Sequence, residues 1–294
     1  MCIIIMIGRL IIGALMIGAV YSVVGIGYSV IYKASGLMSL CQGDMLMFGA
    51  FLGLFFYKTL GLPFPVALLI TTVLMFLLGM GIQKFLVIPL LKKASGFASV
   101  ILCTLALSYV LQNTALLGWG ARMFQFPSIF KISSINIFGI GVAPENALVL
   151  GAAILVMIVL HIFMTKTKFG TAMRAAALDE TAASAVGINV GITKGVAWGI
   201  ASGLAGAIGC LLGPVYGVYT TMGTLIGQKA FAGAVSGGYG NMYGAIIGGM
   251  FFGFAETFIS AYISTSYKDC ISFGILIIIL TFMPTGILKS KVLE

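Results

Sequence analysis

Long uncharged segments dominate this sequence and set the strongest limit on its fold. Seven of them contain at least 19 residues each: 10–32, 59–83, 94–121, 146–165, 195–228, 230–255 and 270–288. A helix that crosses the roughly 30 Å hydrocarbon core of a bilayer needs about 20 residues. Charged residues make up only 8% of the chain, against about 25% in soluble domains, and no period-two alternation of the kind typical of a β-barrel occurs. We therefore expect an all-α, polytopic transmembrane bundle that forms a single domain over residues 1–294.

The positions of lysine and arginine predict the orientation and the number of spans. Basic residues accumulate in cytoplasmic loops, and three groups of them must then share the cytoplasmic side: Lys92 and Lys93; Lys166, Lys168, Arg174 and Lys194; Lys289 and Lys291. An even number of spans between these groups gives about eight or nine in total, near 10–32, 43–58, 64–88, 96–117, 146–164, 195–214, 223–237, 242–262 and 270–288. The N-terminus is then outside, the C-terminus is cytoplasmic, and residues 118–145 form an external loop.

Some of these spans are expected to be short or broken. The second has only thirteen uncharged residues after Asp44, so an irregular element around Gly36–Gly43 would have to complete it. We interpret Gly233–Asn241 as a turn, which makes the preceding span short as well. The N-terminal apolar residues lack the basic region of a signal peptide and are taken as the lead-in to the first span. The net charge is +9, and the basic residues that produce it lie at span ends. This position favours lipid headgroups rather than nucleic acid as their partner.

The 40 glycines recur at small-x-x-x-small spacing within the apolar segments. Such spacing lets transmembrane helices approach closely through their backbones, because lipid tails give no hydrophobic drive for association. The residues that show it are Gly195, Gly199, Gly203, Gly209, Gly213, Gly244, Gly248, Gly249 and Gly253. We expect them to pack helices within the bundle or across a dimer interface, with a glycine-lined substrate path as the alternative.

A charged, alanine-rich segment interrupts the apolar sequence over residues 165–194. Asp179 is placed to cap the N-terminus of a helix that has Glu180 in its first turn, and Gly187 can end it in the left-handed conformation. A helix of seven or eight residues is well below the roughly 12–15 needed for marginal stability alone. We therefore expect this short cytoplasmic helix to dock into another protein, rather than to lie on lipid headgroups.

The same segment resembles the cytoplasmic coupling loop of ABC importer permeases, in which an E-A-A-x-x-x-G helix seats in a cleft of the ATPase subunit. The matching pattern runs from Thr167 to Ala175 and from Glu180 to Ile188. Five other stretches are similar to branched-chain amino-acid permeases of the Liv H-subunit type: "GAVYSVVGIGYSVIYKASGLMSL", "GDMLMFGAF", "LALSYVLQN", "GQKAFAGAVSGGYGNMYGAIIGGMFFGFAET" and "MPTGIL". The resemblance extends over nearly the whole chain.

The resemblance implies a permease subunit of an ATP-driven importer in the bacterial inner membrane that works by alternating access. Its implied partners are two ABC ATPase subunits that bind ATP and magnesium, a second homologous permease subunit, an extracytoplasmic substrate-binding protein and the lipid bilayer. This chain would bind no cofactor or metal itself. The residues expected to couple it to the ATPase are Thr167, Gly170, Arg174, Ala175, Asp179, Glu180, Ala182, Ala183 and Gly187.

The cargo is less well defined than the class of transporter. Where the family usually has N-F-A-H-G, this chain has Ser39-Leu40-Cys41-Gln42-Gly43, close to where substrate would pass. Branched-chain or related amino acids are the first prediction, and urea or short amides are the alternative.

Four polar residues within or beside the apolar segments are candidates for the translocation path or for an internal charge pair: Gln42, Asp44, Lys229 and Glu256. A charge at the bilayer centre costs about 2.5–3.5 kcal/mol on insertion scales, so it should face protein or water. Lys229 and Glu256 are predicted to pair, either as a clamp between two helices or as part of the path. An ion-coupled secondary transporter in which Asp44 and Glu256 titrate is a second, less favoured class.

Enzyme chemistry finds no support in the sequence. There is one histidine, there is no phosphate-binding G-x-x-x-x-G-K-[ST] motif, and the five cysteines are scattered without a C-x-x-C pair. We expect His161 to lie at a helix interface and the cysteines to be buried apolar residues.

Overall fold

The computed structural model describes residues 2–93, 97–130, 135–137, 140–283 and 285–288. Its elements, in chain order, are α1 (Cys2–Ser35), α2 (Gln42–Leu54), the π-helical turn η1 (Phe55–Thr59), α3 (Phe64–Ile82), the π-helical turn η2 (Gln83–Val87), α4 (Ile88–Lys93), α5 (Phe97–Trp119), β1 (Ile135–Ile137), β2 (Ile140–Val142), α6 (Pro144–Lys166), α7 (Lys168–Leu178), α8 (Glu180–Ala185), α9 (Val190–Tyr216), α10 (Met222–Gly238), α11 (Met242–Tyr262) and α12 (Lys268–Phe282).

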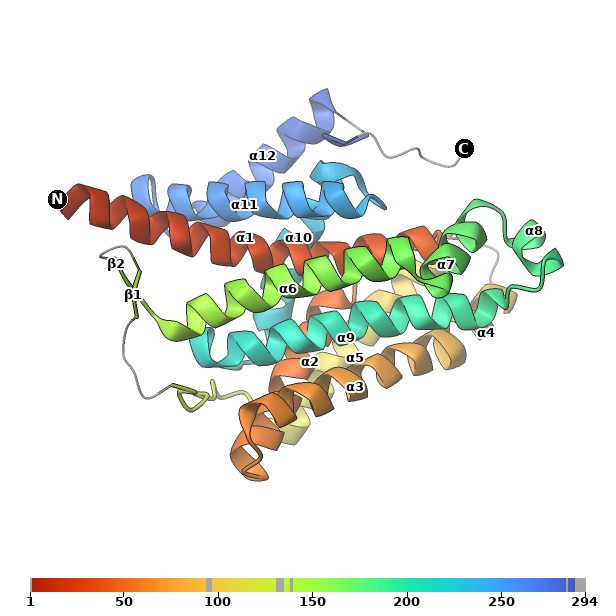
Figure 1. Cartoon of the computed structure of the whole chain (residues 1–294), viewed down its shortest axis with the longest axis horizontal. Helices are drawn as coiled ribbons and strands as arrows, with labels where there is room; N and C mark the ends of the chain where they lie inside the picture. Colours follow the sequence, from red (N-terminus) through yellow and green to blue (C-terminus); the bar gives the residue numbers. More distant parts are fainter. Residues whose placement is uncertain (1, 94–96, 131–134, 138–139, 284, 289–294) are drawn as a thin grey trace.

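The prediction of an all-α polytopic bundle is confirmed, with a helix at each of the nine expected segments. Six helices in the described part of the chain are long and apolar enough to cross a membrane: α1, α3 continued through η2 into α4, α5, α6, α9 and α11. The other three, α2, α10 and α12, have 13, 17 and 15 residues, fewer than the roughly 20 of a full span. The long helices run along the long axis of the molecule, with the N-terminus at one end and α7 and α8 at the other (Figure 1).

Two predicted boundaries are wrong. The last span was expected to reach Leu288, but α12 ends at Phe282, two residues before Pro284, a residue type that disfavours helix in the residue before it. The predicted turn over Gly233–Asn241 is too long, because α10 continues to Gly238 and the chain turns only from there to Asn241. Gly238 and Gly240 adopt positive φ values of 115° and 86°, which glycine reaches without strain.

The two most buried long helices, α1 and α9, form the centre of the bundle. In the most apolar window of α9, 83% of the residues are buried, and in that of α1, 67%. The corresponding windows of α3, α5 and α6 are only 22–28% buried, and these helices expose large apolar side chains such as Leu77, Leu117 and Leu155. The peripheral helices therefore present the surface that lipid tails can contact.

Glycines allow the central helices to approach each other backbone to backbone. At the crossing of α2 and α10, Gly43 lies against Gly223 and Gly227. Other glycine contacts join α2 to α9 (Gly49 with Gly206), α1 to α11 (Gly18 with Gly253) and α10 to α11 (Gly237 with Gly244, and Gly233 with Gly248). Among the nine glycines predicted to pack helices, the five from Gly195 to Gly213 lie in α9 and face α3, α2 and Phe126. These contacts are all within one chain.

The residues between α1 and α2 are irregular, as expected of a broken span. Gly36 ends α1 with a φ of 65°, and residues 36–41 are not helical. Leu37, Ser39 and Cys41 are nevertheless almost fully buried. The chain therefore starts α2 inside the bundle, which brings Asp44 into the protein interior.

The close glycine contacts predict that glycine-to-alanine substitutions at two positions will differ in their effect on stability. Gly248→Ala should destabilise the protein by about 1–3 kcal/mol, because the added methyl group would overlap the Gly233 carbonyl oxygen. Gly151→Ala, on a helix face with nothing within 4 Å of the added methyl group, should be neutral or stabilising by up to about 1 kcal/mol. Thermal unfolding of the two variants in the same detergent compares them, and equal melting temperatures would contradict this packing role.

Candidate functional site

The charged segment forms two short helices that project beyond the bundle at the end opposite the N-terminus (Figure 1). The first, α7, begins at Thr167, whose hydroxyl accepts a hydrogen bond from the backbone N–H of Gly170 at 3.0 Å. Gly170 sits so tightly against the end of α6 that a β-carbon there would lie 2.6 Å from the carbonyl oxygens of Phe163 and Met164. Sequence reasoning missed α7, although a threonine cap before an alanine-rich stretch was a usable signal.

The predicted short helix is present as α8, with the caps that were expected. The Asp179 carboxylate accepts hydrogen bonds from the backbone N–H groups of Thr181 and Ala182 at 2.8 and 3.0 Å, and the bonds from Ala182 and Thr181 lower the pKa of Asp179. At the other end Gly187 has a φ of 86°, while Ile188 N–H reaches the Ala183 carbonyl and Gly187 N–H reaches that of Ser184. This pair of bonds is a Schellman ending.

Helix α8 attaches to the bundle on one face and leaves its other face free of this chain. Ala183 is buried, and Glu180 forms an ion pair with Lys194 of α9 at 2.5 Å. Ala182 is exposed, while Leu178 and Val186 are 75% and 77% exposed. Arg174 is partly buried in α7 and donates a weak 3.3 Å hydrogen bond to Thr171, and Ala175 lies beside it. The tip thus combines apolar side chains with a fixed, capped backbone.

A first cavity of about 470 Å³ lies between α1, α2, α5 and α10. Asp44 lines it together with polar side chains that include Ser108, Gln112, Thr224 and Gln228. Leu40 and Gly43, from the segment that departs from the family pattern, line it too. The cavity therefore places the one acidic side chain of α2 near Leu40, the lining residue of this segment that departs from the family pattern.

Asp44 is 2% exposed, and no lysine or arginine pairs with it in the part of the chain that the structure describes. Its carboxylate is held by neutral donors instead. It accepts hydrogen bonds from Ser108 and from Gln112, the latter at 2.9 Å, with Thr224 at 3.5 Å. Gln42 does not line this cavity; it is buried and donates to the Ala201 carbonyl of α9 at 2.6 Å.

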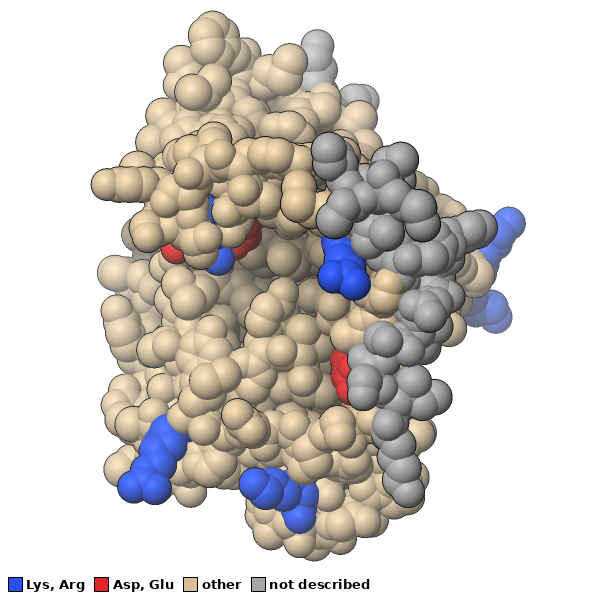
Figure 2. Space-filling view, turned by 90° about the vertical axis from the view of Figure 1, so that its left-hand side faces the viewer, with Lys and Arg blue, Asp and Glu red and all other residues tan. Residues whose placement is uncertain are grey.

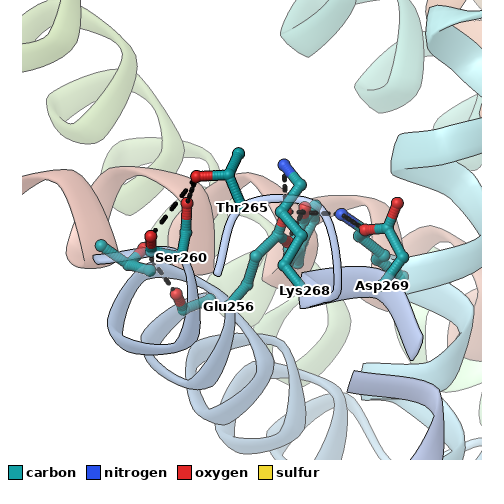
Figure 3. A network of polar contacts seen from close by, with 9 residues as sticks. Glu256, Ser260, Thr265, Lys268 and Asp269 are labelled. Carbon is teal, nitrogen blue, oxygen red and sulfur yellow. Dashed lines mark hydrogen bonds and ion pairs between the residues drawn. The ribbon is translucent and has the colours of Figure 1, made fainter. Parts of the chain in front are cut away.

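Lys229 and Glu256 form the predicted pair, at 2.5 Å, and both side chains are less than 10% exposed. Two further residues that the sequence reading did not include extend the pair, because the start of α12 folds back onto it (Figure 3). Asp269 contacts Lys229 at 2.8 Å, and Lys268 contacts Glu256 at 3.1 Å. Tyr21 also donates to Glu256 at 2.6 Å. We call these four charged residues and Tyr21 the ion-pair cluster.

The ion-pair cluster borders a second cavity, of about 280 Å³, on another face of α10. Lys229, Glu256 and Lys268 line it, and the rest of the wall is apolar or aromatic. It lies at the ends of α9 and α11 and the starts of α10 and α12, which is the end of the molecule that carries the N-terminus. Figure 2, which looks at this end, shows basic and acidic side chains next to each other beside a hollow. Leu225 of α10 lines both cavities.

The remaining sequence candidates take structural positions. His161 of α6 contacts the Tyr243 hydroxyl of α11 at 3.0 Å, as expected of an interface histidine. Cys41 and Cys210 are buried, whereas Cys103 is only partly buried and Cys270 is exposed, so the prediction of buried cysteines is wrong for Cys270. Within the described residues no group of three His, Cys, Asp or Glu side chains could hold a metal ion.

Comparison with known proteins relates the whole chain to transport permeases. A family model described as "branched-chain amino acid transport system / permease component" matches residues 10–280. The high-affinity branched-chain amino acid transport system permease protein LivH of Salmonella typhimurium is 31% identical over 95% of this chain and 94% of its own length. LivH of Escherichia coli K12 gives the same identity and coverage, and BraD of Pseudomonas aeruginosa is 30% identical over 60% of this chain and 61% of its own length.

A solved structure shares the fold at low sequence identity. A chain of the structure titled "PsaBC from Streptococcus pneumoniae in complex with Fab" superposes with a TM-score of 0.52 and 14% identity, covering 95% of each chain. At this identity the similarity concerns the fold alone.

The ion-pair cluster generates a prediction about stability. Lys229→Met should destabilise the protein by about 3–5 kcal/mol, because Glu256 and Asp269 lose their shared buried cation. The double variant Lys229→Met/Glu256→Gln should be more stable than this single variant, since the buried negative charge is then removed. Lys194→Met breaks a pair whose acid is 56% exposed and should cost less than about 1 kcal/mol. Urea or thermal unfolding in detergent ranks the variants; equal losses for Lys194→Met and Lys229→Met would contradict a buried pair.

Proposed function

This chain belongs to the family of branched-chain amino acid transport system permease components, and we propose that it is the membrane subunit of an ATP-driven importer of branched-chain or related amino acids. It is a multi-pass membrane protein of a family of transporter subunits, not of enzymes. The proposal places it in the bacterial inner membrane, with α7 and α8 on the cytoplasmic side and the N-terminus outside. The observation that carries it is the relationship to LivH over 95% of the chain.

The exposed tip of α7 and α8 is the proposed docking site for one partner ATPase subunit. The second ATPase subunit would dock on the second permease subunit. Two exposed apolar side chains flank the six-residue helix α8: Leu178 at the end of α7 and Val186 directly after α8. Such side chains are typical of a surface that a partner covers. Binding and hydrolysis of ATP and magnesium would occur on those partners. Their closure would then displace α8, and α9 with it through the pair between Glu180 and Lys194.

We propose that the cavity lined by Asp44 forms part of the translocation path. It lies beside the irregular segment 36–41, and transporters place irregular backbone next to a central site. Polar or amphipathic side chains on its rim are exposed, among them Gln228 and Tyr109, the latter at 64%. Lipid cannot satisfy an exposed glutamine within the membrane, so we propose that the second permease subunit faces this side.

The Asp44 carboxylate favours a substrate that offers hydrogen-bond donors or a positive charge. The α-ammonium group of an amino acid fits this requirement. An external binding protein would deliver the amino acid to the end of the molecule that carries the N-terminus. The amide groups of urea or a short amide fit it too, and Leu40, which departs from the family pattern, lies in the cavity wall, so this second cargo stays an alternative. Competition of labelled leucine uptake by urea and acetamide separates the two cargoes.

Coupling through α7 and α8 is tested by one acidic substitution on the exposed face of α8 and one in α7. Ala182→Glu and Arg174→Glu should reduce ATP-driven uptake at least about tenfold, because a new carboxylate opposes docking of the apolar tip. ATPase activity of the assembled complex should then no longer respond to substrate. Ala121→Glu, also exposed but at the opposite end, is the matched control and should transport normally.

Normal uptake by both coupling variants would remove the coupling assignment. Uptake that persists without the ATPase subunits and collapses with the ion gradient would instead favour a secondary transporter.

Asp44→Asn tests the path. Asparagine has nearly the same shape: its amide oxygen can accept from Gln112, and its amide NH2 can donate to the Ser108 hydroxyl, which can act as acceptor. The fold should therefore survive while the negative charge is lost. We expect leucine uptake in proteoliposomes to fall at least about tenfold, with an unchanged size-exclusion profile. Full uptake by this variant would exclude Asp44 from the path.

A further inference from the structure

The second cavity has a composition that points to a ligand of its own. One part of its wall is aliphatic, formed by Met16, Ile17, Val20, Leu212 and Ile226. The other part carries the ionisable groups Lys229, Glu256 and Lys268 and the tyrosines Tyr21, Tyr216 and Tyr219. A cavity with an apolar side and a few polar groups at one place is the usual design of a small-molecule site.

The polar part offers hydrogen-bond donors rather than acceptors. The Glu256 carboxylate already accepts from Lys229, Tyr21 and Lys268, so it has little capacity left. Lys268 has one ion pair, at 3.1 Å, and its side chain is 33% exposed, whereas an ammonium group has three donors. Lys229 is shared between Glu256 and Asp269, so the hydrogen-bond donors that remain free belong to the Lys268 ammonium group. A ligand group that complements it is therefore an anion, and the apolar wall selects an anion with a hydrocarbon chain.

We propose that this cavity binds a short aliphatic carboxylate, with the carboxylate at Lys268 and the hydrocarbon chain against α1 and α9. For an amino acid as the natural ligand, this inference rests on the proposed function; binding of the carboxylate itself does not. The two cavities are then complementary. The Lys268 cavity holds the acidic end of an amino acid near the end of the molecule that carries the N-terminus, and the Asp44 cavity, on another face of α10, favours its ammonium end.

The experiment uses the complete chain in its purified complex, in nanodiscs and without ATP or binding protein. Equilibrium binding is measured for three probes of the same chain shape: leucine, 4-methylpentanoate, which has no ammonium group, and leucinamide, which has no carboxylate. We expect 4-methylpentanoate to compete with leucine at this site and leucinamide not to compete. Lys268→Met should weaken binding of 4-methylpentanoate at least about tenfold, which corresponds to about 1.4 kcal/mol.

Two further variants guard against misfolding and unspecific charge effects. Lys268→Arg keeps the positive charge and should retain binding within about threefold, and Arg122→Met, a loss of one exposed charge outside the cavity, should bind like the wild type. Saturable binding of leucine but not of 4-methylpentanoate, if lost in Lys268→Met, supports the site with an amino acid as its ligand. Equal binding by the wild type and Lys268→Met, or no saturable binding of either carboxylate, would overturn the proposal.

The outcome separates this inference from the transport function. ATP-driven uptake without Lys268-dependent binding would contradict the proposed binding site and agree with the importer function. Lys268-dependent binding without ATP-driven uptake would support the proposed binding site and contradict the importer function.

Discussion

Close contact between glycine backbones is the constraint on which the rest of this structure depends. Helices in lipid gain little by burying apolar side chains against each other, so they associate where small residues let their backbones meet. Because Gly43 lies against Gly223 and Gly227, α2 can start inside the bundle and Asp44 can reach the polar side chains of α5 and α10. The glycine contacts of α11 with α1 and α10 hold Glu256 beside Lys229 in the same way.

The two buried acids differ in how their charges are compensated, and under the proposed function this difference separates a structural role for Glu256 from a transport role for Asp44. Glu256 is surrounded by two lysines and a tyrosine hydroxyl, so its charge is neutralised within the protein and locks α10 to α11 and α12. Asp44 is stabilised by neutral donors alone among the described residues. Hydrogen bonds reduce the cost of a buried carboxylate but leave its charge uncompensated. A solute that supplies a donor or a positive charge would complete this site.

The sequence predicted those features that depend on local pattern. Uncharged length located the helices, and Asp179 and Gly187 located both ends of α8 because capping involves residues within one turn. The Lys229–Glu256 pair was also predictable, since both residues stand alone in apolar segments and each needs a partner. The contacts of Gln112 with Asp44 and of Lys268 with Glu256 were not, because they join segments that only the tertiary fold brings together. Helix α7 was missed because the interpretation of the charged segment placed its one helix after the Asp179 cap, although Thr167 is a capping residue as well.

A continuous set of contacts links the exposed tip to the Asp44 cavity. Glu180 of α8 pairs with Lys194 near the start of α9, and α9 runs through the centre of the bundle to Ala201, whose carbonyl accepts the hydrogen bond from Gln42. Gln42 is two residues before Asp44, in the first turn of α2. Because α9 is a continuous helix from Val190 to Tyr216, a shift of α8 has a rigid element to act on. Under the proposed function, Gln42 would therefore not line the path. It would instead transmit a movement of α9 to the start of α2 through its hydrogen bond to Ala201.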